Sequence, residues 1–307
     1  MIYVIGHKSP DLDSVAAAIA WANLENKINK TADYVPATAG DINKETAYVL
    51  EKFGFKVPEK LATAAGQKLY LVDHNEESQI VDGFQKAEIV GVLDHHKINF
   101  KCEKPIEFKN LPWGSACTII AQQYYWKEEK IEKKLAGLML AAILVDTVIT
   151  KSPTCTEIDK EIIAKLAKIS GIKDWRAFGM EIFKVRGAVA DKSASEIIKG
   201  DFKDFDFKAG KFGIGQVETV DLNDFAAKEE AIMAELGKMQ STGGYHSVIL
   251  FITDIIKEGS KFLVATSDAA GMEKALKNKL VDNKVYLPGI MSRKKQVVPM
   301  LGEVFDK

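Results

Sequence analysis

Histidine and aspartate side chains gather in three short segments of this 307-residue chain. The segments are GHKSPDLDS (6–14), LVDHNE (71–76) and VLDHHK (92–97), and in each the His and Asp residues follow a short apolar run that is typical of a strand. In an open parallel sheet, the carboxyl ends of the strands lie along one edge, where ligands bind. We therefore expect these side chains to converge although they are distant in sequence. They are Asp11, Asp13, Asp73, Asp94, His95 and His96.

Carboxylates that converge in this way repel one another and must be neutralised by protons or by cations. A further acid, Asp146, ends the apolar segment LAGLMLAAILVD (135–146), where a lone ionised carboxylate would be costly to desolvate. Mixed Asp and His ligands without Cys suit Mn²⁺, Co²⁺ or Mg²⁺ better than a structural zinc ion. Because the candidate ligands outnumber those that one ion needs, the pattern favours a site for two metal ions.

Each of these residues, taken alone, also has a structural explanation. Asp11 or Asp13 can be the N-cap or a first-turn charge of a helix, and Asp146 can end its helix without binding a ligand. A single His after a strand is more often structural than a metal ligand. We favour the metal site because Asp and His residues follow three predicted strands together.

The composition limits the classes of protein that this chain can belong to. Its length favours two domains, and its 47% hydrophobic and 28% charged residues are ordinary for an α/β protein. A formal net charge of −1 creates no overall field that would attract nucleic acid or an acidic membrane surface. Three scattered cysteines argue against a disulfide framework or a zinc cluster. With no apolar run long enough to span a bilayer and no signal-peptide pattern, we expect a cytoplasmic protein without membrane or nucleic-acid partners.

The spacing of apolar residues predicts the elements that position the acidic and imidazole side chains. We expect strands at 2–5, 34–37, 69–72 and 88–93, and helices at 14–23, 44–53, 115–126, 133–145 and 157–169. Strands that alternate with helices favour a mostly parallel sheet covered by helices. The segment PWGSACT (112–118) can present helix N-terminal amides to an anion or can simply begin a helix.

The sequence changes in character after about Arg186. The small and polar segment VRGAVADKSAS (185–195) resembles a linker. The segments that follow it predict a hairpin at 201–219, a helix at 222–236, and strands at 247–253 and 261–266. The sequence therefore predicts an α/β protein of two domains, the second of them smaller and built on a mixed sheet. The expected division is 1–186 for the metal-binding domain, 187–195 for the linker or hinge, and 196–307 for the C-terminal domain.

Four motifs in a fixed order resemble those of the manganese-dependent, family II inorganic pyrophosphatases of the DHH phosphoesterase superfamily. They are GHKSPDLDS, DHNE, DHH and SRKKQ (292–296), of which the last is specific to this family. The family usually has Asn where Ser9 stands and Thr where Leu12 stands. The resemblance implies hydrolysis of pyrophosphate to two phosphates by a DHH domain and a C-terminal, DHHA2-type, substrate-binding domain. It also implies a homodimer.

The resemblance further implies two Mn²⁺ ions per subunit, with Co²⁺ as a substitute and Mg²⁺ bound with the substrate. One ion would be held by His7, Asp11, Asp73 and Asp146, and the other by Asp13, Asp73, His95 and Asp146, with Asp13 also counted as catalytic. Asp94 and His74 would orient the ligands through hydrogen bonds. His96, Lys203, Arg293 and Lys294 would bind the substrate and act in catalysis. Substrate would draw the two domains together about the linker while the metal ions activate a water.

Two other functions remain open at this point. The chain can be a different DHH phosphoesterase that acts on short oligonucleotides or nucleotide phosphates, and STGGYHS (241–247) faintly resembles a glycine-rich, His-containing motif of those enzymes. Against this, the sequence lacks the combination of aromatic and basic residues on which single strands stack. The chain can also be a metal-dependent phosphate or polyphosphate binder without turnover.

Overall fold

A computed structural model of the chain describes residues 1–187, 189 and 192–306. The chain forms two compact units, Met1–Val185 and Arg186–Lys307. Of the predicted linker 187–195, residues 188, 190 and 191 lie outside the described residues. Val189 packs in a core of the second unit, and a helix begins at Ala194. The predicted linker therefore includes residues that the second unit uses for its own packing.

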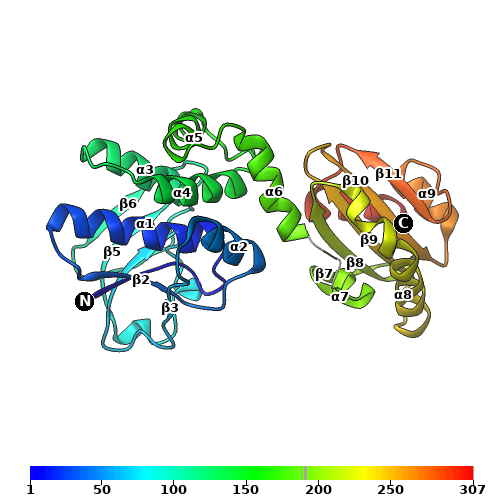
Figure 1. Cartoon of the computed structure of the whole chain (residues 1–307). Helices are drawn as coiled ribbons and strands as arrows, with labels where there is room; N and C mark the ends of the chain where they lie inside the picture. The colour runs from blue at the N-terminus through cyan, green and yellow to red at the C-terminus, as the bar shows by residue number, and fades with distance from the viewer. Residues whose placement is uncertain (188, 190–191, 307) are drawn as a thin grey trace. The chain divides into compact units, whose positions relative to one another are not determined.

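The first unit is built on a six-stranded sheet in which every pair of neighbouring strands is parallel (Figure 1). The strands are β1 (Ile2–Ile5), β2 (Tyr34–Thr38), β3 (Glu59–Lys60), β4 (Lys68–Val72), β5 (Glu88–Asp94) and β6 (Glu107–Asn110), in the spatial order β3-β2-β1-β4-β5-β6. The predicted parallel sheet is thus confirmed. The order of the strands reverses between β1 and β4, which is where open α/β sheets bind their ligands.

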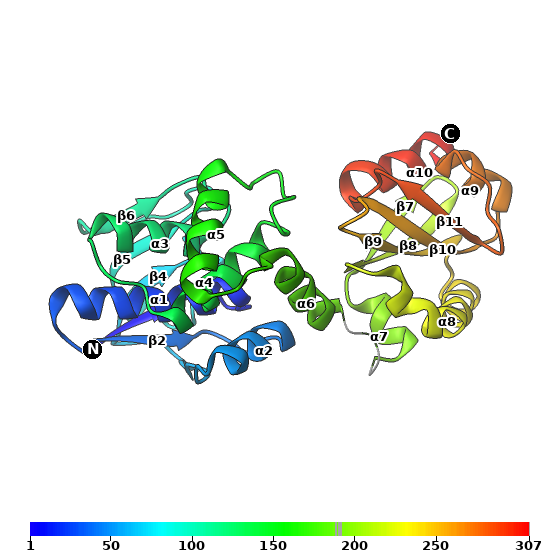
Figure 2. The ribbon, with the colours of Figure 1, turned by 45° about the horizontal axis from the view of Figure 1, so that its top comes forward.

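Helices α1 and α3 pack against strands of this sheet, and α4 packs on them in turn (Figures 1 and 2). The helices of the unit are α1 (Leu12–Asn29), α2 (Lys44–Phe53), α3 (Ala116–Trp126), α4 (Lys133–Asp146), α5 (Glu157–Ser170) and α6 (Trp175–Gly187); the short 3₁₀ turns η1 (Glu77–Gln79) and η2 (Phe84–Lys86) precede β5. Helix α4 also packs against α2 and α5, so every residue from Leu135 to Val145 is buried. This enclosure explains why the sequence of α4 is apolar on all sides.

The second unit is built on a mixed five-stranded sheet, as predicted. Its strands are β7 (Phe202–Phe207), β8 (Gly210–Thr219), β9 (Ser247–Asp254), β10 (Gly259–Thr266) and β11 (Lys284–Pro288), in the order β11-β10-β9-β8-β7. Among the strand pairs that the structure describes in this second sheet, only β8–β9 is parallel. Its helical segments are α7 (Ala194–Lys199), η3 (Leu222–Lys228), α8 (Glu229–Thr242), α9 (Ala269–Leu276), η4 (Arg293–Val297) and α10 (Val298–Phe305).

The second unit corrects one predicted helix. Residues 222–228 form the 3₁₀ segment η3, and the α-helix α8 begins only at Glu229 and continues to Thr242. The strand β9 is buried along its whole length between two apolar clusters, one on each face of the sheet. In the part of the chain that the structure describes, each helix is too short or too polar to cross a lipid bilayer.

The N-cap of α2 offers a test of stability. The side chain of Asn43 accepts a hydrogen bond from Thr46 N–H at 2.8 Å. We expect Asn43→Ala to lower the free energy of unfolding by about 1 kcal/mol, because Thr46 N–H loses its partner. Urea denaturation followed by circular dichroism measures the change. Asn43→Ser keeps an acceptor and should lose much less, so equal losses in the two variants would contradict this role of the cap.

Candidate metal centre

Six acidic and imidazole side chains meet at the carboxyl ends of β1, β4 and β5. The ligand atoms of one group lie within 4.8 Å of one another, and so do those of a second group. The first group is Asp13, Asp73, His95 and Asp146, and the second is His7, Asp11 and Asp73. All six predicted metal ligands are therefore brought together, and Asp73 belongs to both groups. A cavity of about 560 Å³ is lined by His7, Asp11, Asp73 and Asp146.

Asp11 is both an N-cap and a member of the cluster. Its Oδ1 accepts a hydrogen bond from Ser14 N–H at 3.0 Å and so begins helix α1. Its Oδ2 lies 3.6 Å from His7 Nε2, which in turn lies 3.5 Å from Asp73 Oδ2. The two explanations that the sequence offered for Asp11 thus apply to different oxygens of the same carboxylate.

Asp13 faces the N-terminus of helix α3. Its Oδ1 accepts hydrogen bonds from Ser115 Oγ at 2.7 Å and Cys117 N–H at 3.1 Å, and its Oδ2 accepts from Ala116 N–H at 2.6 Å. The amides of the segment PWGSACT are thus directed at a carboxylate of the chain itself. These donors and the positive end of the helix dipole stabilise the charge of Asp13, which is almost fully buried.

Asp73 lies at the centre of the cluster in an unusual backbone conformation. Its φ is +62°, in the left-handed region that non-glycine residues adopt infrequently. Its backbone N–H donates to Leu93 O at 2.9 Å, and Ser14 Oγ donates to its Oδ2 at 2.6 Å. The other oxygen, Oδ1, lies 3.2 Å from His95 Nε2. Such strain is retained where the surroundings fix a side chain for function.

Asp146 is the last residue of α4, as the sequence indicates. Its Oδ2 lies 3.5 Å from His95 Nε2. After it, Val148, Ile149 and Thr150 have φ values of +50°, +52° and +68°, which is rare for three consecutive β-branched residues. The backbone is therefore strained at two places beside the cluster, at Asp73 after β4 and at residues 148–150 after α4. The structure does not place Asp146 in the group of His7 and Asp11, and its predicted bridging of both ions stays a prediction.

The ring of His95 is held in one orientation by a backbone carbonyl. Its Nδ1 donates to Trp113 O at 3.0 Å, which leaves Nε2 directed at Asp73 and Asp146. A metal-bound imidazole is ordinarily held in this way, by a hydrogen bond from its second nitrogen. The geometry of His95 therefore suits a ligand that binds through Nε2.

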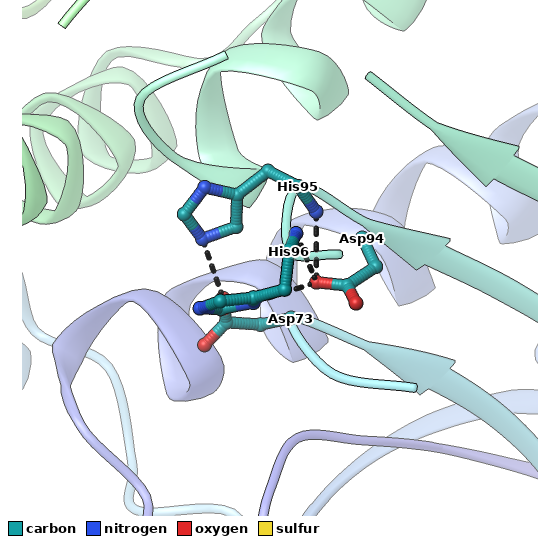
Figure 3. Close-up of side chains that lie close together, drawn as sticks. All are labelled: Asp73, Asp94, His95 and His96. Atoms are coloured by element: carbon teal, nitrogen blue, oxygen red, sulfur yellow. Dashed lines mark hydrogen bonds and ion pairs between the residues drawn. The ribbon is translucent and has the colours of Figure 1, made fainter. Parts of the chain in front are cut away.

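Asp94 bonds with both histidines of the DHH motif (Figure 3). Its Oδ1 accepts from His95 N–H at 2.7 Å and from His96 Nδ1 at 2.9 Å, and its Oδ2 accepts from Asn75 Nδ2. Burial favours the neutral form, but the hydrogen bonds from His96 and Asn75 hold the pKa of Asp94 below its usual value. A buried carboxylate thus holds the ring of His96 and the backbone of His95.

His74 is a buried neutral residue beside the cluster. Its Nδ1 donates to Val72 O at 2.9 Å, and burial lowers the pKa of its ring to about 4. The ring contacts that of His7 edge-on, with 6.4 Å between centroids. The hydrogen bond of His74 thus goes to a main-chain carbonyl and not to a metal ligand, so its predicted orientation of the ligands through hydrogen bonds stays a prediction.

Burial and mutual repulsion favour protonated side chains within the cluster. Burial, followed by the charge of Asp13, raises the pKa of Asp73 to about 6, and burial with Asp13 and Asp73 raises that of Asp146 well above its usual value. Burial acts to lower the pKa of His95, but its bond to Asp73 and the neighbouring charges raise it to about 9. Divalent cations would neutralise the same charges. Four carboxylates and two imidazoles without Cys fit Mn²⁺.

Comparisons with known proteins agree with this chemistry along the whole chain. The DHH family, N-terminal domain, matches residues 1–143, and the DHHA2 domain matches residues 180–304. The chain is 48% identical over 309 residues to the manganese-dependent inorganic pyrophosphatase of Methanothrix thermoacetophila, with 100% of this chain and 99% of that protein covered. It is 43% identical over 314 residues to the corresponding protein of Methanocaldococcus jannaschii, with 100% of both covered. The chain belongs to the family of manganese-dependent inorganic pyrophosphatases.

A solved structure extends this agreement to the fold of the family. A Methanococcus jannaschii protein described as a family II inorganic pyrophosphatase is 43% identical, with a TM-score of 0.66 and 100% of both chains covered.

Two positions depart from the usual family motif. Leu12 is fully buried in the first turn of α1, whereas Ser9 is exposed and lines the same cavity as His7.

The pyrophosphatase motif SRKKQ forms a π-helical turn in the second unit. Arg293 is buried there: its Nη1 donates to Asp201 O at 2.6 Å and Ile214 O at 3.1 Å, and its Nη2 pairs with Asp201 Oδ1 at 2.6 Å. Lys294 is exposed, as is Lys203 on β7. In this conformation Arg293 holds the turn against Asp201, just before β7, and against β8, while the two lysines are exposed to solvent. Substrate binding by the three residues stays a prediction.

The histidine of STGGYHS, the segment that suggested a different DHH phosphoesterase, packs against aromatic rings of the second unit. The ring of His246 stacks on Phe212 with 4.9 Å between centroids and an interplanar angle of 14°. It also contacts Phe305 edge-on, and its Nδ1 bonds with Ser247 Oγ. These contacts give His246 a structural explanation, so the segment no longer favours the rival enzyme.

The sequence patterns do not identify the residues that hold the ligands in place. Ser14 Oγ, Ser115 Oγ and Trp113 O bond with Asp73, Asp13 and His95 respectively. Ser14 had a detectable signal, since it stands three residues after a predicted N-cap. Trp113 acts through its backbone carbonyl, which no pattern of residue types reveals.

The shared position of Asp73 predicts a loss at both metal sites from one substitution. We expect Asp73→Asn to weaken binding of both Mn²⁺ ions by more than about tenfold, because each group loses a charged oxygen. Calorimetric titration of the metal-free protein with Mn²⁺ measures both affinities. Asp254→Asn removes another buried carboxyl, in the second unit, and should leave both unchanged. Loss of one ion only would contradict the sharing of Asp73.

The raised pKa of His95 predicts that metal binding depends on pH. Since its pKa is about 9 without metal, Nε2 carries a proton at neutral pH that must leave before this atom can bind an ion. The Mn²⁺ affinity should therefore rise as pH increases toward about 9, with release of protons. Calorimetry in two buffers of different ionisation enthalpy measures the release, and His95→Gln should reduce it. An affinity independent of pH would contradict this account.

Proposed function

We propose that this chain hydrolyses inorganic pyrophosphate to two phosphates, using two Mn²⁺ ions held by His7, Asp11, Asp13, Asp73, His95 and Asp146. The observation that carries the proposal is the convergence of two ligand groups on Asp73 in a member of this family. The relatives that match it along their full length are named manganese-dependent inorganic pyrophosphatases.

The chain's own residues would hold the ions and the substrate. Bound divalent ions lower the pKa of water and neutralise charge on phosphate oxygens. Asp73 and His95 fix the ligand geometry before substrate arrives, because Ser14 Oγ and Trp113 O hold them in place. Catalysis of phosphoryl transfer depends largely on such positioning and on charge stabilisation.

His96 is the proposed donor to a phosphate oxygen. Its Nδ1 bonds with Asp94, and this bond raises the pKa of the imidazole, although burial and the neighbouring His95 oppose the shift. The side chain of His96 is 55% exposed and lines the same cavity as His7 and Asp73. A protonated ring would place a hydrogen-bond donor and a positive charge next to the metal ligands.

Lys203, Arg293 and Lys294 are the proposed basic residues of the substrate site. Lys294 and Lys203 offer exposed ammonium groups, which bind phosphate as point charges. Arg293 can contribute in two ways: through the turn that it braces, and through its own guanidinium if Asp201 releases it. A homodimer and a cytoplasmic location stay predictions, as do Co²⁺ as a substitute and Mg²⁺ bound with the substrate.

The proposal is tested by removing metal with a chelator and restoring Mn²⁺, Co²⁺, Mg²⁺ or Zn²⁺ separately. We expect phosphate release from pyrophosphate to return with Mn²⁺ and to exceed cleavage of a dinucleotide under the same conditions. Preferential cleavage of the dinucleotide would favour the other DHH phosphoesterases. Binding of pyrophosphate with no phosphate release under Mn²⁺ would favour a binding protein without turnover.

Two adjacent lysines of the SRKKQ motif provide a matched pair of variants. We expect Lys294→Ala to raise the KM for pyrophosphate by roughly 10- to 100-fold, because a charge-assisted hydrogen bond contributes about 1.5–3 kcal/mol. Lys295→Ala removes an exposed charge from the same turn and should change KM much less. Steady-state phosphate release measures both. Equal effects would indicate a general electrostatic contribution in place of a specific contact.

A further inference from the structure

A buried carboxylate outside the six metal residues links helix α5 to the start of helix α3. Asp159 is fully buried in the first turn of α5. Its Oδ2 accepts a hydrogen bond from Thr156 N–H at 2.7 Å and its own N–H donates to Thr156 Oγ1 at 3.3 Å, which together form a capping box; Oδ2 also accepts from Thr156 Oγ1 at 2.6 Å. It also accepts from Gly114 N–H, at 2.9 Å to Oδ2, and from Thr118 Oγ1 at 2.6 Å. The capping box involves only Thr156 and Asp159, so the bonds from Gly114 and Thr118 are additional and join α5 to the start of α3.

The segment that Asp159 holds, residues 113–118, orients two of the proposed metal ligands. Trp113 O accepts the hydrogen bond from His95 Nδ1 at 3.0 Å. Ser115 Oγ donates to Asp13, as do the N–H groups of Ala116 and Cys117. Asp159 binds this segment at Gly114 and at Thr118, on either side of the residues that hold Asp13. It therefore fixes the donors and the acceptor on which both ligands depend.

The fit at Gly114 shows how closely this segment is seated. A Cβ atom at this position would lie 2.9 Å from Asp159 Oδ2 and 2.7 Å from Thr147 Cγ2. Thr147 directly follows Asp146, a third member of the same ligand group. The segment is thus packed between the carboxylate of Asp159 and the end of α4.

We infer that Asp159 is a positioning residue for one metal site, the one formed by Asp13, Asp73, His95 and Asp146. This inference rests on the proposed function, because it assigns a role toward ions that those residues would hold. The other group is oriented by different donors: Ser14 N–H bonds with Asp11, and Ser14 Oγ bonds with Asp73. Loss of Asp159 should therefore affect the two ions unequally, which a general loss of stability would not do.

The test is a Mn²⁺ titration of the metal-free, full-length protein, read by calorimetry and by electron paramagnetic resonance of free Mn²⁺. His7→Ala and His95→Ala first assign the two binding steps. We expect Asp159→Ala to weaken the step assigned to His95 by about 10- to 100-fold, as removal of a supporting residue does at other metal sites. The step assigned to His7 should keep its affinity. Asn43→Ala, which weakens the cap of α2, is the control for lost stability.

A second variant keeps the test decisive if Asp159→Ala does not fold. Thr118→Val has nearly the same shape but removes the hydroxyl that donates to Asp159, and it should also weaken the His95 step selectively. Unchanged binding at both steps in the folded variants, or equal weakening of the two, overturns the inference. A wild-type protein that binds no Mn²⁺ would instead count against the proposed function, so the two failures are distinguishable.

Discussion

The repulsion between buried carboxylates is the constraint on which the rest of this structure depends. Asp13, Asp73 and Asp146 lie close enough together that burial and mutual charge raise the pKa of two of them. Water would screen this repulsion at a surface, but at the ends of these strands the side chains are largely shielded from solvent. The fold must therefore supply positive charge or lose the ionised state, and the cluster is stable as a set of anions only around cations.

The fold meets this constraint with fixed hydrogen-bond donors as well as with metal ligands. The amides at the start of α3 stabilise Asp13, Ser14 Oγ stabilises Asp73, and N–H groups of His95, His96 and Asn75 stabilise Asp94. These donors come from segments that are far apart in sequence and that the strand order brings to one edge. Because these donors already hold the carboxylates in place, binding of an ion would require little rearrangement of the side chains.

The sequence predicts the strands and helices whose apolar pattern and flanking motifs are clear. The strands β1 and β5 are apolar and end in Asp or His motifs, so both the parallel sheet and the convergence of the ligands follow from spacing. The strands β3 and β6 are short and carry charged residues at exposed edges, so apolar periodicity misses them. Contacts of the backbone, such as Trp113 O on His95, and the burial of Arg293 depend on tertiary packing that residue types do not encode.

The enclosure of α4 bears on the size of the ion that the proposed metal site could accept. Helices α1, α2, α3 and α5 pack against α4. A shift of Asp146 along the helix axis would therefore displace many close-packed side chains. A smaller or larger cation would then have to be accommodated by the carboxylates that project from loops and first turns. Discrimination between divalent ions of different size would thus depend in part on the stiffness of α4, the buried helix that carries Asp146.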